Sequence, residues 1–485
     1  MKYIVKFFPE IMIKGDAIKK KMVRRLHENV LRLLKRLDEA IVTTKYWDKI
    51  EVFVPAEQPG LVNEVEKVLL NTPGIDQVWR VKQFPIHNLD SVVEQVVPYA
   101  LPLIKAKTFA VRARRAGHHP FTSLELECEV GRLLCEQGEG LGVDLKKPEV
   151  KVEFDIYDNT LNIIEARLPA MGGYPIGSQG EALSLMSGGF DSTVASYLSI
   201  KRGVKTHFIF FNLGGKAHEL GVKQVAIHLW NKFESSHRIH FITVPFEEVV
   251  AELFRSVHES YMGVMLKRLM LQAAEQVAEQ LGIQTLITGE SVAQVSSQTL
   301  KNLAAIDQAC TKLVLRPLAF MHKTEIMAIA DQIGTRQFAE TMPEYCGVIS
   351  RNPVIDASFH RTLKEAGRFD DTVLQQAIAK MAISAVDQLV EQIVQSSPIE
   401  VVTDLEQTDV LVDIRAEIEQ QSKPLHGAIS VPFYQLAQAA KKWSADRRYL
   451  LYCKKGVLSQ LHAQYLRDAG YSNVFVFRAN QGSSE

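Results

Sequence analysis

The chain has 485 residues, is 46% hydrophobic and 23% charged, and carries a formal net charge of +0. This length is too great for one core and predicts about three or four domains of ordinary soluble composition. The apolar runs are too short for a membrane span, Lys6 and Glu10 interrupt the first one, and the scattered cysteines indicate a reducing compartment, so we expect a cytoplasmic protein with no membrane association.

The first 60 residues alternate between strand and helix patterns. Tyr3–Phe7 and Ile50–Val54 are typical of strands, and the spacing of apolar residues predicts a helix over Ala17–Leu37. Basic residues outnumber acidic ones over residues 1–50, which matters for RNA binding. A solvated surface helix explains the same pattern equally well.

Residues 61–168 show a second mixed α/β pattern, with a strand from Phe109 that ends in basic residues. A helix follows Phe121, with Thr122 or Ser123 as its cap. A basic strand end beside a helix N-terminus can hold RNA phosphates without reading bases. The run from Arg112 to Gly131 resembles the THUMP domain, an RNA-binding module of tRNA-modifying enzymes that grips the acceptor end of tRNA. The expected RNA-binding residues are Lys105, Lys107, Arg112, Arg114 and Arg115.

Turn-forming residues at 172–178 predict a domain boundary, and residues 178–395 then have the pattern of a doubly wound parallel sheet. Ligands of such sheets bind at the carboxyl ends of the strands. The expected strands are Leu183–Met186, Thr206–Phe211, Ile239–Val244 and Thr285–Thr288.

The stretch Ser187–Ser192 joins the first of these strands to a helix. Its two glycines let the backbone approach a ligand closely, and N–H groups at a helix N-terminus bind phosphate. The lysine of a Walker A loop is missing. The motif S-G-G-x-D-S instead resembles the loop of PP-loop ATP pyrophosphatases, which split ATP between its α- and β-phosphates and adenylate a carbonyl oxygen. The alternative is a glycine turn without a ligand.

Other polar residues are expected at the same sheet edge. Gly289 follows a strand, Gln298 lies nearby in sequence, and Lys267 and Lys323 lie in helical stretches. Each also has an ordinary explanation, as a turn glycine or a solvated surface residue. Together with the loop they favour a nucleotide pocket, in which Lys323 would face the charge that develops at the α-phosphate.

The cysteines divide into two groups. Cys346 lies in a short loop flanked by proline and glycine, whereas Cys128, Cys135 and Cys310 have the surroundings of buried structural residues. The chain contains no C-x-x-C, so we expect no zinc or iron–sulfur site. Residues 370–396 predict a long amphipathic helix that bridges to the last domain.

Residues 400–485 predict a separate small α/β domain with strands at Val410–Ile414 and Tyr449–Tyr452. Cys453 follows the second strand at a turn into a helix, where N–H groups and two adjacent lysines favour a thiolate. The spacing resembles the rhodanese (sulfurtransferase) fold. Ser459 stands where the C-x5-R motif of phosphatases needs arginine, which argues against phosphatase chemistry. The arginine of thiosulfate rhodaneses is also missing, which argues against a thiosulfate donor.

The four units in this order, with Cys346 and Cys453, resemble the family of bacterial tRNA 4-thiouridine synthetases that also serve thiamine biosynthesis. The resemblance covers the whole chain and implies a multidomain protein of the α/β and α+β classes. The implied domains are ferredoxin-like at 1–60, THUMP at 61–168, a PP-loop ATP pyrophosphatase at 178–395 and a rhodanese-like domain at 400–485.

By this resemblance the chain adenylates O4 of the uridine at position 8 of tRNA, with ATP and Mg²⁺, and Asp191 and Lys323 serve that step. Cys453 receives persulfide sulfur from a cysteine desulfurase, and Cys346 releases the sulfur by closing a disulfide with Cys453. The family implies a thiamine sulfur-carrier protein as a second acceptor and allows a homodimer. The implied ATP-contact positions are Leu185, Met186, Ser187, Gly188, Gly189, Asp191, Ser192, Lys267, Gly289 and Gln298.

Three other functions remain open at this stage. The chain could be another adenylating enzyme with the same loop, such as a tRNA 2-thiouridylase, a lysidine synthetase or an ammonia-dependent synthetase. It could be a non-catalytic tRNA-binding protein, against which the intact loop and Cys453 argue. It could also be a persulfide carrier that serves only the thiamine pathway.

Overall fold

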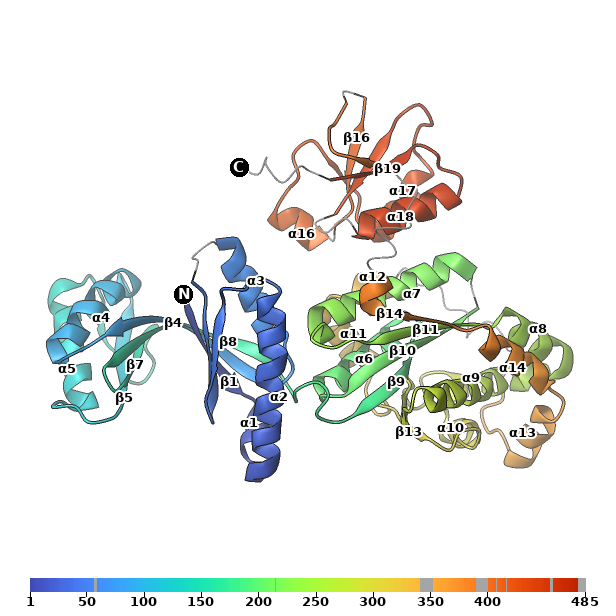
Figure 1. Ribbon diagram of the computed structural model, residues 1–485, viewed down its shortest axis with the longest axis horizontal. Helices are drawn as coiled ribbons and strands as arrows, with labels where there is room; N and C mark the ends of the chain where they lie inside the picture. Colours follow the sequence, from blue (N-terminus) through green and yellow to red (C-terminus); the bar gives the residue numbers. More distant parts are fainter. Residues whose placement is uncertain are drawn as a thin grey trace. The chain divides into compact units, whose positions relative to one another are not determined.

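The computed structural model describes residues 1–55, 59–213, 215–340, 352–389, 400–406, 408–415, 417–453 and 457–478. The chain forms two compact units (Figure 1), one of residues 1–178 with 201–203 and the other of 179–200 with the rest of the chain from 204. Among the described residues, no helix combines the length and the apolar character that crossing a membrane requires.

One eight-stranded sheet runs through the whole first unit. Its two long strands, β4 and β8, pair with each other, and their register shifts at Arg80/Val81. On its other side β4 pairs with β1, and β8 pairs with β7. The two halves that the sequence suggests therefore share one sheet. In order across the sheet the strands are β2 (Val42–Lys45), β3 (Lys49–Phe53), β1 (Lys2–Phe7), β4 (Ile75–Pro85), β8 (Thr160–Gly172), β7 (Val150–Tyr157), β5 (Thr108–Ala116) and β6 (Gly142–Val143).

Each half of this sheet has its own helices and its own core. The predicted basic helix is confirmed as α2 (Asp16–Lys35), whose apolar face is buried with β1 and β3. The helices are α1 (Pro9–Met12), α2 and α3 (Pro59–Leu70) in the first half, and α4 (Leu89–Ile104) and α5 (Ser123–Gln137) in the second.

Helix α5 confirms the predicted cap and corrects the prediction for two cysteines. Thr122 accepts the N–H of Glu125, and the Glu125 carboxylate accepts the N–H of Thr122, which closes a capping box. Cys128 and Cys135 were expected in the core, but both are exposed. They lie seven residues apart on one face, and the opposite face buries Leu126, Val130 and Leu134.

The second unit contains a six-stranded sheet in the order β13-β12-β9-β10-β11-β14. From β9 the chain first adds β10 and β11 on one side of the sheet. It then adds β12 and β13 on the other side of β9, so the strand order reverses between β9 and β12. All four predicted strands are confirmed. The strands are β9 (Glu181–Leu185), β10 (Lys205–Asn212), β11 (His240–Pro245), β12 (Thr285–Ile287) and β13 (Leu313–Leu315), all parallel, and the antiparallel edge strand β14 (Ala382–Ala385).

Helices cover this sheet, and the glycine loop leads into one of them, α6. The longest of the described helices over this sheet is α9, which confirms the helical stretch expected at Lys267. The helices that concern the site are α6 (Phe190–Lys201), α7 (Gly215–Leu229), α9 (Met262–Gln280), α10 (Leu300–Asp307) and α11 (Lys323–Ile333).

The predicted long helix over residues 370–396 is wrong in part. The structure has a short helix, α14 (Asp371–Ala379), and then the strand β14, whose register pairs His240 with Ala385 at the edge of the sheet. Hydrogen bonding to β11 outweighs the local helical preference. Residues 390–399 lie outside the described part.

The C-terminal region contains a five-stranded parallel sheet, which confirms the predicted strands there. Helix α18 (Val457–Asp468) follows the cysteine loop as expected. In order across the sheet the strands are β15 (Val401–Val402), β19 (Val474–Phe477), β18 (Tyr449–Tyr452), β16 (Val410–Asp413) and β17 (Ile429–Ser430).

Candidate functional site

The glycine loop turns from β9 into α6 and is fixed by its own hydroxyl groups. The N–H of Ser187 donates to Ser192 Oγ at 3.1 Å, and Thr193 Oγ1 donates to the carbonyl of Gly189 at 2.8 Å. Gly188 has φ +83°, which favours glycine at this turn. His218 Nε2, on α7, donates to the Ser187 carbonyl at 3.1 Å. The loop is therefore held in place from both ends.

Gly289 lies directly against the start of α6. A Cβ built at this position would come within 2.6 Å of the carbonyl carbon of Asp191 and of the nitrogen of Ser192. Both atoms belong to the backbone and cannot move aside as a flexible side chain would. The close approach of the segment after β12 to the start of α6 thus requires glycine.

Asp191 joins three segments at this point. Its Oδ1 pairs with Lys323 Nζ at 2.9 Å, and its Oδ2 accepts a hydrogen bond from Gln294 Nε2 at 2.8 Å. Lys323 is the first residue of α11, and its ammonium lies 5.3 Å from the ring centroid of Phe190. The arrangement places one carboxylate and one partly exposed ammonium beside the loop, where the ammonium can stabilise negative charge on a ligand.

A buried carboxylate organises the adjoining wall. Glu290 pairs with Lys267 Nζ at 2.7 Å and with Arg316 Nε at 2.8 Å, and Thr288 Oγ1 donates to it at 3.1 Å. Burial alone would raise the pKa of Glu290, but the two cations outweigh burial and hold that pKa below its ordinary value. Arg316 also donates two hydrogen bonds to the Asp307 carboxylate, from Nη1 at 3.0 Å and from Nη2 at 2.5 Å. This network fixes Lys267, on α9, at the edge of the cavity.

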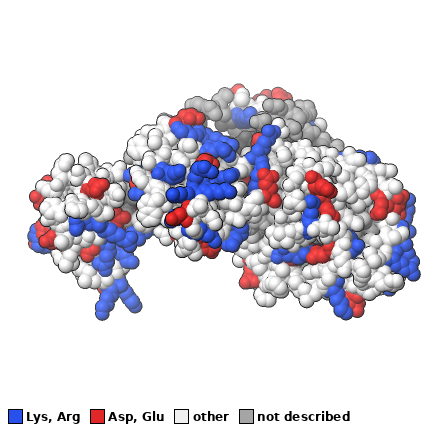
Figure 2. All heavy atoms as spheres, turned by 60° about the horizontal axis from the view of Figure 1, so that its bottom comes forward, with Lys and Arg blue, Asp and Glu red and all other residues white. Residues whose placement is uncertain are grey.

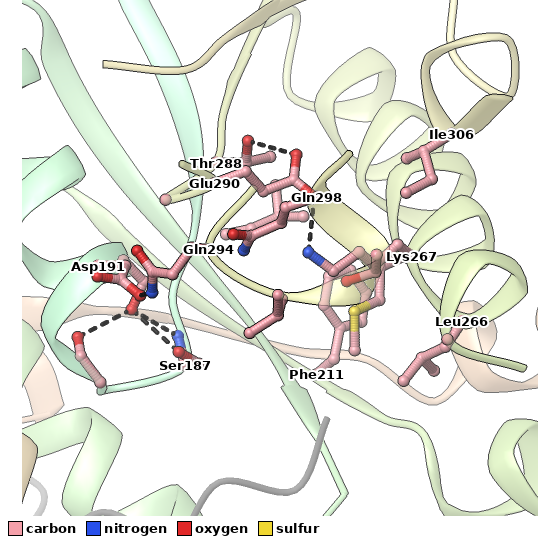
Figure 3. Close-up of a pocket in the computed structure, with 18 of the residues that line it drawn as sticks. Ser187, Asp191, Phe211, Leu266, Lys267, Thr288, Glu290, Gln294, Gln298 and Ile306 are labelled. Carbon is pink, nitrogen blue, oxygen red and sulfur yellow. Dashed lines mark hydrogen bonds and ion pairs between the residues drawn. The ribbon is translucent and has the colours of Figure 1, made fainter. Parts of the chain in front are cut away.

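These side chains surround a cavity of about 800 Å³ (Figure 3). Gln298 is 7% exposed, and its Oε1 has no hydrogen-bond partner among the described residues, so a donor from a ligand would satisfy it. Of the predicted ATP-contact residues, Gly188 forms the turn and the others line the cavity. Those others are Leu185, Met186, Ser187, Gly189, Asp191, Ser192, Lys267, Gly289 and Gln298.

Sequence reasoning did not assign Glu290, Gln294 or His218 to the site. Glu290 directly follows Gly289, but its partners lie 23 and 26 positions away, and only the fold brings them together. Within the described chain, no three or more His, Cys, Asp or Glu side chains are grouped to hold a metal ion.

Cys453 of the C-terminal region directly follows β18. Cys453 is 6% exposed, and its sulfur accepts the Ser459 N–H at 3.2 Å and contacts Ser459 Oγ at 3.4 Å. Both contacts are to Ser459, which lies two residues into α18, so the start of this helix positions the thiol. Cys346, the expected second thiol, lies outside the described residues, so its predicted role stays a prediction.

The expected RNA-binding residues do not all lie together. Register along β5 puts Arg112 and Arg114 on one face of the sheet. Arg115 is on the opposite face, where its Nη1 contacts the Gly117 carbonyl and His119. Lys105 and Lys107 precede the other end of β5, roughly 20 Å away at about 3.3 Å per residue. Figure 2 shows that lysine and arginine side chains also gather on the face of this unit that carries α2.

Comparison with protein families matches three segments of the chain. A model described as "Thiamine biosynthesis protein (ThiI)" matches residues 177–370, the THUMP domain matches 87–164, and a rhodanese-like domain matches 397–479. The first covers the glycine loop and the cavity, the second covers β5, and the third covers Cys453.

Curated relatives match over essentially the whole chain. A tRNA sulfurtransferase of Pseudomonas putida is 45% identical over 482 residues, which is 99% of this chain and 100% of the relative. One from Azotobacter vinelandii is also 45% identical, with the same coverage. Among solved structures, one described as a 4-thiouridine synthetase–RNA complex with bound ATP has a TM-score of 0.70 and 24% identity. It covers 79% of this chain and 99% of its own, which shows a shared fold.

Proposed function

The chain belongs to the tRNA sulfurtransferase family, and we propose that it activates a uridine carbonyl of tRNA with ATP and replaces the oxygen with sulfur. The observation that carries this proposal is the glycine loop, which opens on one cavity together with the Asp191–Lys323 ion pair. The loop N–H groups suit the phosphates, and the unpartnered Gln298 oxygen suits a donor on the nucleoside.

In the first step, O4 of the uridine attacks the α-phosphorus of ATP. The bond to the bridging β-phosphate oxygen breaks, pyrophosphate leaves, and an adenylated uridine forms. Loop N–H groups and Lys323 stabilise the charge that develops on the phosphates. Following the family resemblance, we assign the uridine at position 8, so that the product is 4-thiouridine.

Mg²⁺ fits this site through Asp191. The ion commonly binds one or two carboxylates and completes its shell with phosphate oxygens and water. Asp191 lies in the loop itself, and its carboxylate keeps a quarter of its side-chain surface exposed, at 24%. When bound, the ion neutralises phosphate charge.

The second step uses the thiol loop. A persulfide on Cys453 attacks C4 of the adenylated uridine through its terminal sulfur, and AMP leaves. The Cys346 thiolate then attacks Cys453 Sγ, which breaks the S–S bond, leaves sulfur on the uridine and joins the two cysteines in a disulfide. A cellular thiol reduces the disulfide before the next turnover.

We assign a cysteine desulfurase as the persulfide donor and the reducing cytoplasm as the compartment. The name of the family model over 177–370 supports a second sulfur acceptor, a thiamine sulfur-carrier protein. We also propose the domains 1–60, 61–168, 178–395 and 400–485, of which the first two share one sheet and helix α3 spans the boundary between them. We propose a homodimer, and the molar mass from light scattering tests this assembly.

The first experiment is nucleoside analysis of tRNA by mass spectrometry. Unmodified tRNA is incubated with the protein, ATP, Mg²⁺, a cysteine desulfurase and cysteine, in parallel with the Cys453→Ala variant. We expect 4-thiouridine only when Cys453 is present. If AMP forms in both samples and 4-thiouridine in neither, the loop is assigned correctly and the sulfur acceptor is wrong. Formation of the carrier protein's thiocarboxylate tests the thiamine role in the same mixture.

A further inference from the structure

Three large aromatic side chains are exposed close together on the first unit. Tyr46 and Trp47 lie at the β2–β3 turn, which is closed by the Tyr46 N–H donating to the Lys49 carbonyl at 2.8 Å. Trp47 is 74% exposed and Tyr46 is 42% exposed. Tyr157, at the end of β7, is 60% exposed. Such a concentration of exposed aromatic surface marks an interaction site.

Lys49 contacts both Tyr46 and Tyr157, which are more than a hundred residues apart in the sequence. Its ammonium lies 5.0 Å from the ring centroid of Tyr46 and 5.7 Å from that of Tyr157. The β2–β3 turn therefore reaches the end of β7, where Tyr46 and Tyr157 share one cation, and Trp47 follows Tyr46 in the same turn. These three residues are called the aromatic cluster.

This aromatic cluster shares a face of the sheet with the basic strand β5. Arg112 pairs with Glu153 and Arg114 with Asp155 in parallel register, and Tyr157 lies two residues farther along β7. The alternate residues of β7, Phe154 among them, are buried on the opposite face with α4 and α5. Tyr157 thus lies on the same side as Arg112 and Arg114.

Two lysines near the cluster are engaged by carboxylates. Lys49 pairs with Glu51 at 2.7 Å, and Lys6 lies 4.0 Å from Asp48. Lysines that are paired with carboxylates are less available for phosphate, whereas the exposed aromatic rings offer faces on which a base can stack. We infer that the cluster of Tyr46, Trp47 and Tyr157 is a stacking platform for an unpaired base of tRNA, on the face that Arg112 and Arg114 extend. This inference rests on the proposed function.

The test measures the affinity of the full-length protein for tRNA over a range of salt concentrations. Trp47→Ala and Tyr157→Ala should each raise the Kd about tenfold, since stacking contributes roughly 1–3 kcal/mol per base. The slope of log K against log salt should not change, because a stacked base releases no counterions. Trp47→Phe and Tyr157→Phe should keep most of the affinity. Phe53→Ala, at the far end of β3 and 51% exposed, is the matched control.

A blunt RNA duplex without unpaired nucleotides is the second probe. It should bind the wild type and the alanine variants alike. Equal losses on the duplex, or a flattened salt slope, would overturn the inference in favour of phosphate contacts. Wild-type affinity in both alanine variants would also overturn it and would assign the cluster to a protein partner. If the wild type itself does not bind tRNA, the proposed function fails first.

Discussion

Gly289 packs against the glycine loop so closely that no side chain fits there. The methyl group of Gly289→Ala would lie 2.6 Å from backbone atoms of Asp191 and Ser192, so the loop or β12 must shift. Since the loop N–H groups must converge on the phosphates, we expect a loss of ATP affinity of at least tenfold, or about 1.4 kcal/mol. Calorimetric titration with ATP measures it.

Gly367→Ala is the matched control in the same unit. Its methyl group would meet only the carbonyl oxygens of Leu363 and Lys364, at 3.6 and 3.7 Å, which are ordinary contact distances. ATP affinity should not change in this variant. Unchanged affinity in Gly289→Ala as well would show that the loop does not bind the phosphates.

Glu290 is the residue on which the wall of the cavity depends. Glu290→Gln keeps the shape but leaves Lys267 and Arg316 without the buried charge that compensates them. Breaking a buried ion pair on one side commonly costs 3–5 kcal/mol, and Arg316 keeps Asp307, so we expect a loss of about 3 kcal/mol in unfolding free energy at pH 7. Urea denaturation measures the loss.

The effect of this substitution should depend on pH. The folded-state pKa of Glu290 lies below the ordinary value of 4.5, so the unfolded chain takes up the proton first as the pH falls. The stability that Glu290 contributes is therefore complete above about pH 5 and is lost as the pH falls through the folded pKa. The difference between wild type and Glu290→Gln should shrink below about pH 4.5. Exposed Glu248→Gln should show neither effect.

At the scale of helices and strands, the sequence predicts most elements because each has a local signal. The four strands predicted at 183–288 are short apolar runs, and α5 begins at a capping box within its own sequence. The predictions that fail are those that depend on contacts between distant parts of the chain. Residues 382–385 become a strand only because β11 leaves an open edge, and Cys128 and Cys135 are exposed because α5 turns another face to the sheet.

The strand β5 gives a prediction about RNA binding. Arg112 and Arg114 share one face, so Arg112→Gln with Arg114→Gln should weaken tRNA binding and reduce the salt slope by about 2, one for each lost phosphate contact. Arg115→Gln, on the opposite face, should change the slope much less. Filter binding from low to high salt measures all three proteins. An equal effect of Arg115→Gln would place both faces of the strand against RNA.

At the scale of the whole molecule, the sequence predicts the components of the site better than their connections. The glycine loop and Lys323 are recognisable separately, but their link through Asp191 spans 132 positions. The network of Glu290 with Lys267 and Arg316 also depends on side chains that only the sheet brings together. A local sequence pattern cannot show that residues so far apart in the sequence form ion pairs. The sequence therefore predicts single residues such as Lys323, and only the structure shows which residues they pair with.

The proposed sulfur transfer needs two cysteines, Cys346 and Cys453, that are 107 positions apart in the chain. Without Cys346, sulfur can reach the uridine but its bond to Cys453 is not cleaved, so Cys346→Ala should abolish multiple turnover and leave at most one tRNA joined to each enzyme through Cys453. Nucleotide binding should be intact. Calorimetry with ATP and single- and multiple-turnover assays of 4-thiouridine separate the two properties, with Cys310→Ala as the control. Equal loss of ATP affinity in Cys346→Ala would indicate a packing defect, and normal multiple turnover would mean that another thiol releases the sulfur.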